Sequence, residues 1–144
     1  MNNDLHFSSA TGKWDTPAHV VKDLATVFAW DWDVCADRAN VCKRFYGEQD
    51  SALDHHWRGL CWMNPPYGRG IGAWMKKAAR ETEATIVCLV PARTDTAWWH
   101  NNIPFASLVV FIRGRLKFGG SPNAAPFPSG FLVFGETLTD DQRD

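Results

Sequence analysis

Two short apolar runs, separated by a segment of helical length, constrain the fold more than any other feature of this sequence. Leu60-Cys61-Trp62-Met63 is apolar at every position, and residues 86–90 form a second run of the same kind. A strand without polar alternation is covered on both faces, which is typical of a parallel sheet. Residues 73–82, between the runs, have the length of a crossover helix, so we predict a right-handed βαβ unit.

The part of the chain before this unit predicts a helix and a strand. Residues 16–28 carry apolar side chains at helical spacing, with Thr16 placed to cap the helix and Pro17 at its first position. Residues 30–36 alternate between large apolar and acidic side chains, which favours a strand. Residues 44–46 could add a short strand.

The part after the unit predicts a strand pair. A short helix is expected to begin at residues 94–96, and strands are expected at 108–118 and 130–135. The loop 119–129 joins these strands without a helix, so their pairing is most simply antiparallel. The sequence therefore predicts an α/β protein with a mostly parallel sheet and an antiparallel last strand.

Size and charge limit how the chain could act. With 144 residues it is expected to form one compact domain, residues 1–144, without a separate target-recognition domain. The 15 Lys and Arg against 16 Asp and Glu leave it near neutrality, so a polyanion would have to be bound through a local patch. The longest apolar runs are far below the ~20 residues that span a bilayer. No signal sequence is recognisable at the start, and we expect a cytoplasmic protein without a membrane segment.

Cysteine and histidine placement argues against a metal site. The four cysteines, at positions 35, 42, 61 and 88, form no Cys-x-x-Cys pair and are expected to be reduced thiols. The adjacent His55 and His56 have no cysteine nearby and are more typical of a solvated loop. We expect no bound metal.

Asn64-Pro65-Pro66-Tyr67 directly follows the first apolar run, where an open α/β sheet places its ligands. A ring-conjugated amine is a poor nucleophile, and holding both its hydrogens helps it to attack. The Asn64 side-chain oxygen can accept one of them and the Pro65 carbonyl the other, while Tyr67 offers a flat face for an unstacked base. The alternative is a rigid turn after a strand.

In several places the sequence resembles the phage-type, Dam-like DNA adenine methyltransferases, which use S-adenosylmethionine. The resemblance covers most of the chain and consists of motifs in the same order. They are Trp14-Asp15-Thr16-Pro17, Asp33-Val34-Cys35-Ala36 with Asn40, Trp57, Asn64-Pro65-Pro66-Tyr67-Gly68, Trp74, Val90-Pro91-Ala92-Arg93-Thr94-Asp95-Thr96 and Gly114-Arg115-Leu116-Lys117-Phe118. It implies a Rossmann-like methyltransferase fold and methylation of the exocyclic amine of adenine in DNA.

The resemblance also implies roles for individual residues. Asn64, Pro65 and Tyr67 would hold and stack the target adenine, with Pro66 beside the substrate. Cofactor-binding residues would be Trp14, Thr16 and Pro17 toward the methionine end, Asp33 near the amino group, Asn40 as a further polar contact, and Asp50 or Asp54 near the cofactor adenine. The alternative for each acidic residue is a cap or a solvated loop.

Glycine placement departs from the common pattern of such enzymes. Residues 33–36 contain no glycine, whereas a Gly-x-Gly turn usually follows the first strand and lets the backbone approach the cofactor. Gly68, Gly70 and Gly72 instead follow the strand that leads into Asn64-Pro65-Pro66-Tyr67. They could form a hinged lid over the base or a plain flexible turn.

Cations near the end of the chain are candidates for DNA contacts. Arg113, Arg115 and Lys117 alternate along a predicted strand and would share one face. This row is either a phosphate-binding stripe beside loop 119–129 or a charged face that maintains solubility. Arg93 follows a strand at the same edge as Asn64 and is a candidate phosphate or substrate contact.

Other functions remain open on the sequence. The same tetrapeptide could serve a methyltransferase that acts on RNA adenine or on a protein glutamine. The missing glycine turn also keeps open a catalytically inactive nucleic-acid-binding module. A homodimer is a further expectation, because so small a chain could use a second copy to cover its target. The protein would act in the host cytoplasm if a phage encodes it.

Overall fold

In the part of the chain that the structure describes, a five-stranded sheet organises the fold, in the strand order β1-β2-β3-β5-β4. The computed structural model describes residues 14–36, 40–135 and 142. Strands β1 (Trp32–Asp33), β2 (Gly59–Met63) and β3 (Ala84–Pro91) are parallel. Strand β5 (Ser129–Phe134) runs antiparallel to its neighbours β3 and β4 (Ala106–Phe111). The predicted antiparallel last strand is confirmed.

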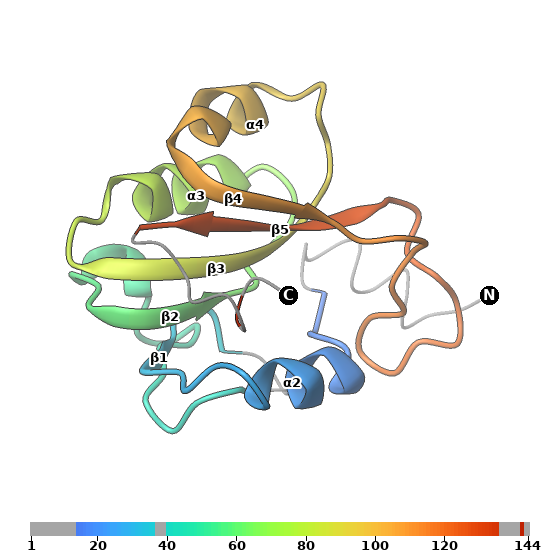
Figure 1. The fold of residues 1–144 in the computed structure, drawn as a ribbon, viewed down its shortest axis with the longest axis horizontal. Coiled ribbons are helices and arrows are strands. Elements are labelled where there is room, and N and C mark those ends of the chain that lie inside the picture. The colour runs from blue at the N-terminus through green and yellow to red at the C-terminus, as the bar shows by residue number, and fades with distance from the viewer. Residues whose placement is uncertain (1–13, 37–39, 136–141, 143–144) are drawn as a thin grey trace.

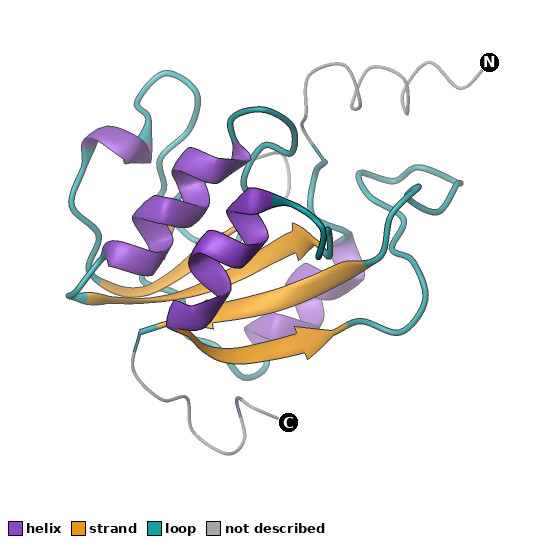
Figure 2. Ribbon diagram, turned by 90° about the horizontal axis from the view of Figure 1, so that it is seen from above, coloured by secondary structure: helices purple, strands orange, loops and turns teal. Residues whose placement is uncertain are grey.

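Helices cover both faces of this sheet. Helix α3 (Ile71–Arg80) and helix α4 (Ala97–Asn102) lie side by side on one face, and helix α2 (Ala18–Ala25) lies on the other (Figures 1 and 2). Two 3-10 turns, Ala52–Asp54 and Ile103–Phe105, connect the elements. The predicted unit of two parallel strands joined by a helix is therefore confirmed as β2-α3-β3. Most of β3 is buried, as its unbroken apolar sequence predicts.

The first strand is shorter than predicted. Only Trp32 and Asp33 pair with β2, whereas a strand over residues 30–36 was expected. Phe45 forms a parallel bridge with Asp33, so the short strand expected at 44–46 is present as a single bridge. The N–H of Val34 still donates to the carbonyl of Trp62 at 3.0 Å, so the chain follows the sheet edge for one residue more.

The ends of two helices also differ from the prediction. Pro17 lies one position before the first residue of α2, and no side chain caps this helix, so the expected cap at Thr16 is wrong. Helix α3 begins at Ile71, which places Gly72 inside the helix and Gly70 at its cap in a helical conformation. Residues 68–70 form a turn before the helix, with Gly68 at a φ of 126°, whereas Gly72 belongs to the helix itself.

Strand β4 ends at Phe111 and does not reach residue 118 as predicted. Gly114 adopts a φ of 76°, a left-handed conformation that does not continue a strand. Leu116 and Phe118 beyond it are nevertheless buried, and the N–H of Ala125 donates to the Leu116 carbonyl at 2.8 Å. The predicted alternation of faces is therefore retained in an irregular segment packed on the protein.

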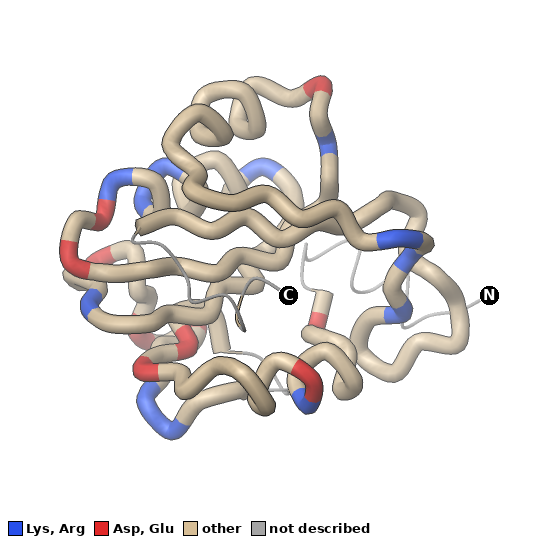
Figure 3. Tube along the Cα trace, in the orientation of Figure 1, with Lys and Arg blue, Asp and Glu red and all other residues tan. Residues whose placement is uncertain are grey.

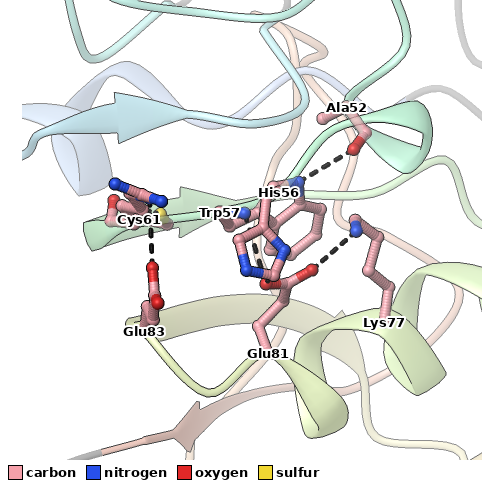
Figure 4. A network of polar contacts seen from close by, with 8 residues as sticks. Ala52, His56, Trp57, Cys61, Lys77, Glu81 and Glu83 are labelled. Atoms are coloured by element: carbon pink, nitrogen blue, oxygen red, sulfur yellow. Dashed lines mark hydrogen bonds and ion pairs between the residues drawn. The ribbon is translucent and has the colours of Figure 1, made fainter.

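A buried carboxylate ties the end of α3 to the segment before β2 (Figure 4). Glu81 accepts hydrogen bonds from Lys77 Nζ at 2.6 Å and from the backbone N–H of Trp57 at 3.2 Å, and its side chain is 7% exposed. The Trp57 indole Nε1 donates to the Ala52 carbonyl at 2.9 Å, and its ring stacks against Trp74. Trp57 is thereby fixed between the turn at Ala52–Asp54 and helix α3.

Candidate active site

The loops after the strands meet at one edge of the sheet. Because β1, β2 and β3 are parallel, residues 34–36, 64–67 and 92–96 follow them at the same carboxyl edge. The segment 112–128 between β4 and β5 lies there too, since Phe111 pairs with Gly130 and Pro91 with Ser129 (Figure 1). This is the edge at which open α/β sheets bind ligands.

Asn64 is the buried polar residue at the centre of this edge. Its side-chain Nδ2 donates to the carbonyl of Trp14 at 2.6 Å and to the hydroxyl Oγ1 of Thr16 at 3.0 Å. Its Oδ1 accepts from the hydroxyl of Tyr67 at 2.7 Å. Asn64 is 6% exposed and Thr16 is 3% exposed, so the amide and its partners are held away from bulk water.

Tyr67 lies inside the protein with its hydroxyl toward the sheet. The hydroxyl lies 3.0 Å from the Leu89 carbonyl as well as near Asn64. The ring makes edge contacts with Phe118 and Phe127, with centroids 6.1 Å and 5.6 Å away, and the residue is 7% exposed. In this structure the ring therefore packs on aromatic neighbours from the segment 112–128.

A cavity of about 780 Å³ opens on one side of Asn64. Residues 34–36 after β1, residues 64–66 after β2, and Tyr46 with residues 47–49 and Ser51 form its wall. Trp14, Asp15 and Trp74 complete the lining. The cavity therefore combines a mainly apolar lining with two carboxylates, those of Asp15 and Glu48.

A second cavity, of about 410 Å³, opens on the other side of the tetrapeptide. Its lining residues are Trp14, Tyr67, Gly68, Ile71, Pro91, Arg93, Thr96, Trp98, Pro126 and Phe127. Trp14 lines both cavities, so the segment before α2 forms a shared wall. Aromatic side chains and one exposed guanidinium, that of Arg93 lying 5.4 Å from the Phe127 ring centroid, characterise this second space.

An aromatic cluster joins the start of the described chain to the segment between β4 and β5. Trp14 makes edge contacts with Phe118 and Phe127, at centroid distances of 5.7 Å and 5.2 Å. The N–H of Gly119 also donates to the Asp15 carbonyl at 2.9 Å. Sequence reasoning missed this cluster, because the partners lie about a hundred positions apart and no local period links them.

Asp33 organises the turn that lacks glycine. Its Oδ1 accepts from the N–H of Cys35 at 3.1 Å and its Oδ2 from the N–H of Val41 at 3.2 Å, and the residue is 2% exposed. A side-chain oxygen that accepts from the N–H two residues on is an Asx turn. The carboxylate thus holds residues 34–36 in place as one wall of the larger cavity.

The other residues predicted to bind the cofactor are divided between the cavity and its surroundings. Trp14 lines the larger cavity, whereas Thr16 and Pro17 are buried and do not belong to its lining. Asn40 is exposed and accepts from the N–H of Cys42, and Asp50 pairs with His55 at 2.7 Å. Neither Asn40 nor Asp50 belongs to the lining. Tyr46 and residues 47–49 line it instead. They directly follow the bridge at Phe45, and sequence reasoning did not use this position to predict them as lining residues.

Of the cations predicted to contact DNA, one lines a cavity and three do not. Arg93 lines the second cavity. Arg113, Arg115 and Lys117 are exposed along the segment that follows β4, outside both cavities but at the same edge of the sheet (Figure 3). These three residues form the basic segment of the protein.

Clustered metal-ligand side chains and membrane-spanning helices are both absent from the described residues. Within residues 14–36, 40–135 and 142, no group of three or more His, Cys, Asp or Glu side chains is arranged to hold a metal ion. The four cysteines are free thiols, with Cys61 and Cys88 buried and Cys35 and Cys42 half-buried. Across the same described residues, no helix has the length and apolar character needed to cross a bilayer.

The parallel strands, the Asn-Pro-Pro-Tyr segment and the two flanking cavities define an α/β protein with a candidate ligand site at the carboxyl edge of its sheet. The family model of DNA N-6-adenine-methyltransferases (Dam) matches residues 6–137, and the chain belongs to this family. A DNA N-6-adenine-methyltransferase of Haemophilus phage HP1 (strain HP1c1) is 29% identical over 112 residues. The aligned part is 73% of this chain and 65% of the relative, so it spans just under two thirds of the relative's length. No solved structure matches the chain.

Proposed function

We propose that the chain is an enzyme that transfers a methyl group from S-adenosylmethionine to the exocyclic amine of adenine in DNA. Family membership supports the reaction and the DNA substrate. The observation that carries the proposal is the position of Asn64, a buried amide that lines the larger cavity and bonds to Tyr67, which lines the second. A Rossmann-like methyltransferase fold agrees with the parallel strands and the antiparallel β5.

The larger cavity suits the proposed cofactor. Its volume of about 780 Å³ lies within the range of roughly 300–1,000 Å³ that is usual for ligand sites. Val34, Ala36 and Trp74 offer apolar surface to an adenosine, and the carboxylates of Asp15 and Glu48 can attract positive charge. S-adenosylmethionine supplies an electrophilic methyl group on a positively charged sulfur.

The protein's contribution is to hold and orient the amine. The Asn64 Oδ1 and the Pro65 carbonyl accept the two amine hydrogens, and the fixed φ of Pro65 and Pro66 restricts the backbone on both sides of that carbonyl. An amide is not a general base, so Asn64 leaves the proton on the amine until the new bond has formed. The proton then passes to solvent.

The second cavity receives the target base. Its aromatic lining, Trp98 and Phe127 above all, suits a planar ring, and Arg93 at its mouth suits the adjoining phosphate. Taking an adenine out of a duplex costs a few kcal/mol, which contacts of this kind offset. Stacking on Tyr67, as the motif predicts, requires its ring to separate from Phe118 or Phe127.

Labelled methyl donor tests the proposal against the alternatives. The purified protein is incubated with labelled S-adenosylmethionine and, separately, DNA, RNA or protein extract. We expect label in DNA, at the adenine N6 position on nucleoside analysis. Label in protein glutamine or RNA alone would contradict the choice of DNA. Absence of calorimetric binding of S-adenosylmethionine would favour the inactive nucleic-acid-binding module.

Asn64→Ala tests the assigned role of the tetrapeptide. We expect transfer to be lost while the cofactor still binds, because the larger cavity keeps its other lining residues. Loss of cofactor binding with no selective effect on transfer would contradict the role.

The homodimer stays a prediction. Sedimentation of the protein with and without DNA would measure its oligomeric state.

A further inference from the structure

We propose that the hydroxyls of Thr16 and Tyr67, together with the Trp14 carbonyl, are positioning groups that fix the Asn64 amide so that one lone pair of its Oδ1 faces the target amine. This inference rests on the proposed function and deepens it. It assigns to Thr16 and to the Tyr67 hydroxyl a role that differs from cofactor contact and from base stacking.

The hydrogen bonds identify which terminal atom of the Asn64 side chain is the nitrogen and which is the oxygen. The Trp14 carbonyl can only accept, and it lies 2.6 Å from one terminal atom of the Asn64 side chain, so that atom is the nitrogen. Its second hydrogen is directed to Thr16 Oγ1 at 3.0 Å. Both amide hydrogens are therefore used. Oδ1 has two lone pairs, of which Tyr67 takes one and leaves one.

The partners come from separate parts of the fold, which makes the arrangement stiff. Trp14 and Thr16 precede α2, whereas Tyr67 follows β2 and its hydroxyl also lies 3.0 Å from the Leu89 carbonyl in β3. The hydroxyl has one hydrogen, and the shorter distance of 2.7 Å favours Asn64 as its acceptor. Breaking any of these bonds would leave a buried polar group unsatisfied.

Such a fixed amide matters for this chemistry because an asparagine side chain can rotate by half a turn. A rotated Asn64 would present an NH₂ donor to an NH₂ substrate, and neither could accept the other's hydrogen. The Trp14 carbonyl excludes that orientation, since it would then face Oδ1. The positioning groups thereby keep the acceptor on the side where the amine must be held.

Two isosteric variants test the proposal. Tyr67→Phe keeps the ring, and Thr16→Val keeps the shape, but each removes one hydroxyl. We expect each to lower kcat for DNA methylation about tenfold, with KM for DNA and cofactor Kd within about twofold of wild type. Thr16→Ser should restore most of the rate lost in Thr16→Val. The matched control is Thr26→Val, whose hydroxyl bonds to the Asp23 carbonyl at the exposed end of α2.

Unchanged kcat in both variants would overturn the proposal. A raised cofactor Kd with unchanged kcat in Thr16→Val would also overturn it, because Thr16 would then be a cofactor contact. Tyr67→Phe decides the matter if Thr16→Val does not fold. Failure of the proposed function is seen separately, as absence of DNA methylation by the wild type. In that case NMR measures how fast the amide hydrogens of the Asn64 side chain exchange with solvent. Slow exchange in wild type and fast exchange in Thr16→Val would support the positioning role. Fast exchange in both proteins would refute it.

Discussion

At Asp33, a carboxylate supports a turn that glycine commonly forms in cofactor-binding α/β proteins. We expect Asp33→Ala to lower the free energy of unfolding by about 1–3 kcal/mol, because the backbone N–H groups of Cys35 and Val41 would lose their acceptors. Affinity for S-adenosylmethionine should fall with it, since residues 34–36 line the larger cavity. Urea unfolding and calorimetry measure the two effects.

Asp33→Asn retains one oxygen acceptor and should lie between wild type and Asp33→Ala. Asp23→Ala, at an exposed position of α2, is the control and should change neither quantity measurably. An Asp33→Ala protein with wild-type stability and affinity would contradict the turn-organising role.

Two buried thiols give the stability of the protein a dependence on high pH. Burial, followed by the charges of Asp31 and Glu81, raises the pKa of Cys61 to about 12, and burial raises the pKa of Cys88 well above its ordinary value. An unfolded thiol ionises near its ordinary value of 9.0, so above that pH the unfolded chain binds fewer protons than the folded one. The free energy of unfolding should therefore fall as pH rises from about 9 toward 12.

Cys88→Ala provides the check. Chemical unfolding at a series of pH values should show a slope above pH 9 that is shallower than wild type by about 1.4 kcal/mol per pH unit. Comparing slopes separates this effect from the constant cost of the smaller side chain. Identical slopes in the two proteins would show that Cys88 ionises alike in both states.

At the level of elements, two glutamates near the end of α3 differ sharply in what they stabilise. Glu81 is almost buried and bonds to Lys77 and to the Trp57 backbone, whereas Glu83 pairs with Arg58 at 3.0 Å with both side chains more than half exposed. We expect Glu81→Ala to lower the free energy of unfolding by about 3 kcal/mol. Glu83→Ala should cost less than about 1 kcal/mol, because solvent screens an exposed pair. Urea unfolding of the two variants side by side measures the difference.

The sequence predicts the position of a helix or strand well where the pattern that indicates it lies within that element. Strands β2 and β3 are close to their predicted positions because the apolar runs are local features. The far end of β4 was wrong because Gly114 ends the strand inside an alternating pattern. The packing of Tyr67 against Phe127 and the bond from Asn64 to Thr16 join distant segments, and no local pattern contains them. The sequence therefore located the tetrapeptide but not the groups that hold it.

At the scale of the whole molecule, near-neutral charge makes the placement of cations decisive for the proposed DNA binding. Replacing all three residues of the basic segment by alanine should weaken binding and lower the slope of log affinity against log salt by about one unit per cation. Arg80→Ala is the control, because Arg80 lies at the end of α3, which is opposite to the carboxyl edge of the sheet. Fluorescence anisotropy over a salt series gives both slopes.

A triple variant with the wild-type slope would show that the basic segment serves solubility, and Arg93 would then be the next cation to test. A fall in affinity without a change of slope would indicate that the substitutions disturb the fold and do not remove phosphate contacts.

The bond between Asn64 and the Trp14 carbonyl spans 50 positions of the chain. Contacts of this separation close large loops, and their entropic cost makes them late events in folding. The tetrapeptide can follow β2 early, yet the orientation of its amide is settled only when the segment before α2 has docked. A refolding chain should thus regain helix and sheet before it regains the proposed methyl transfer, so recovery of activity would report the last step of assembly.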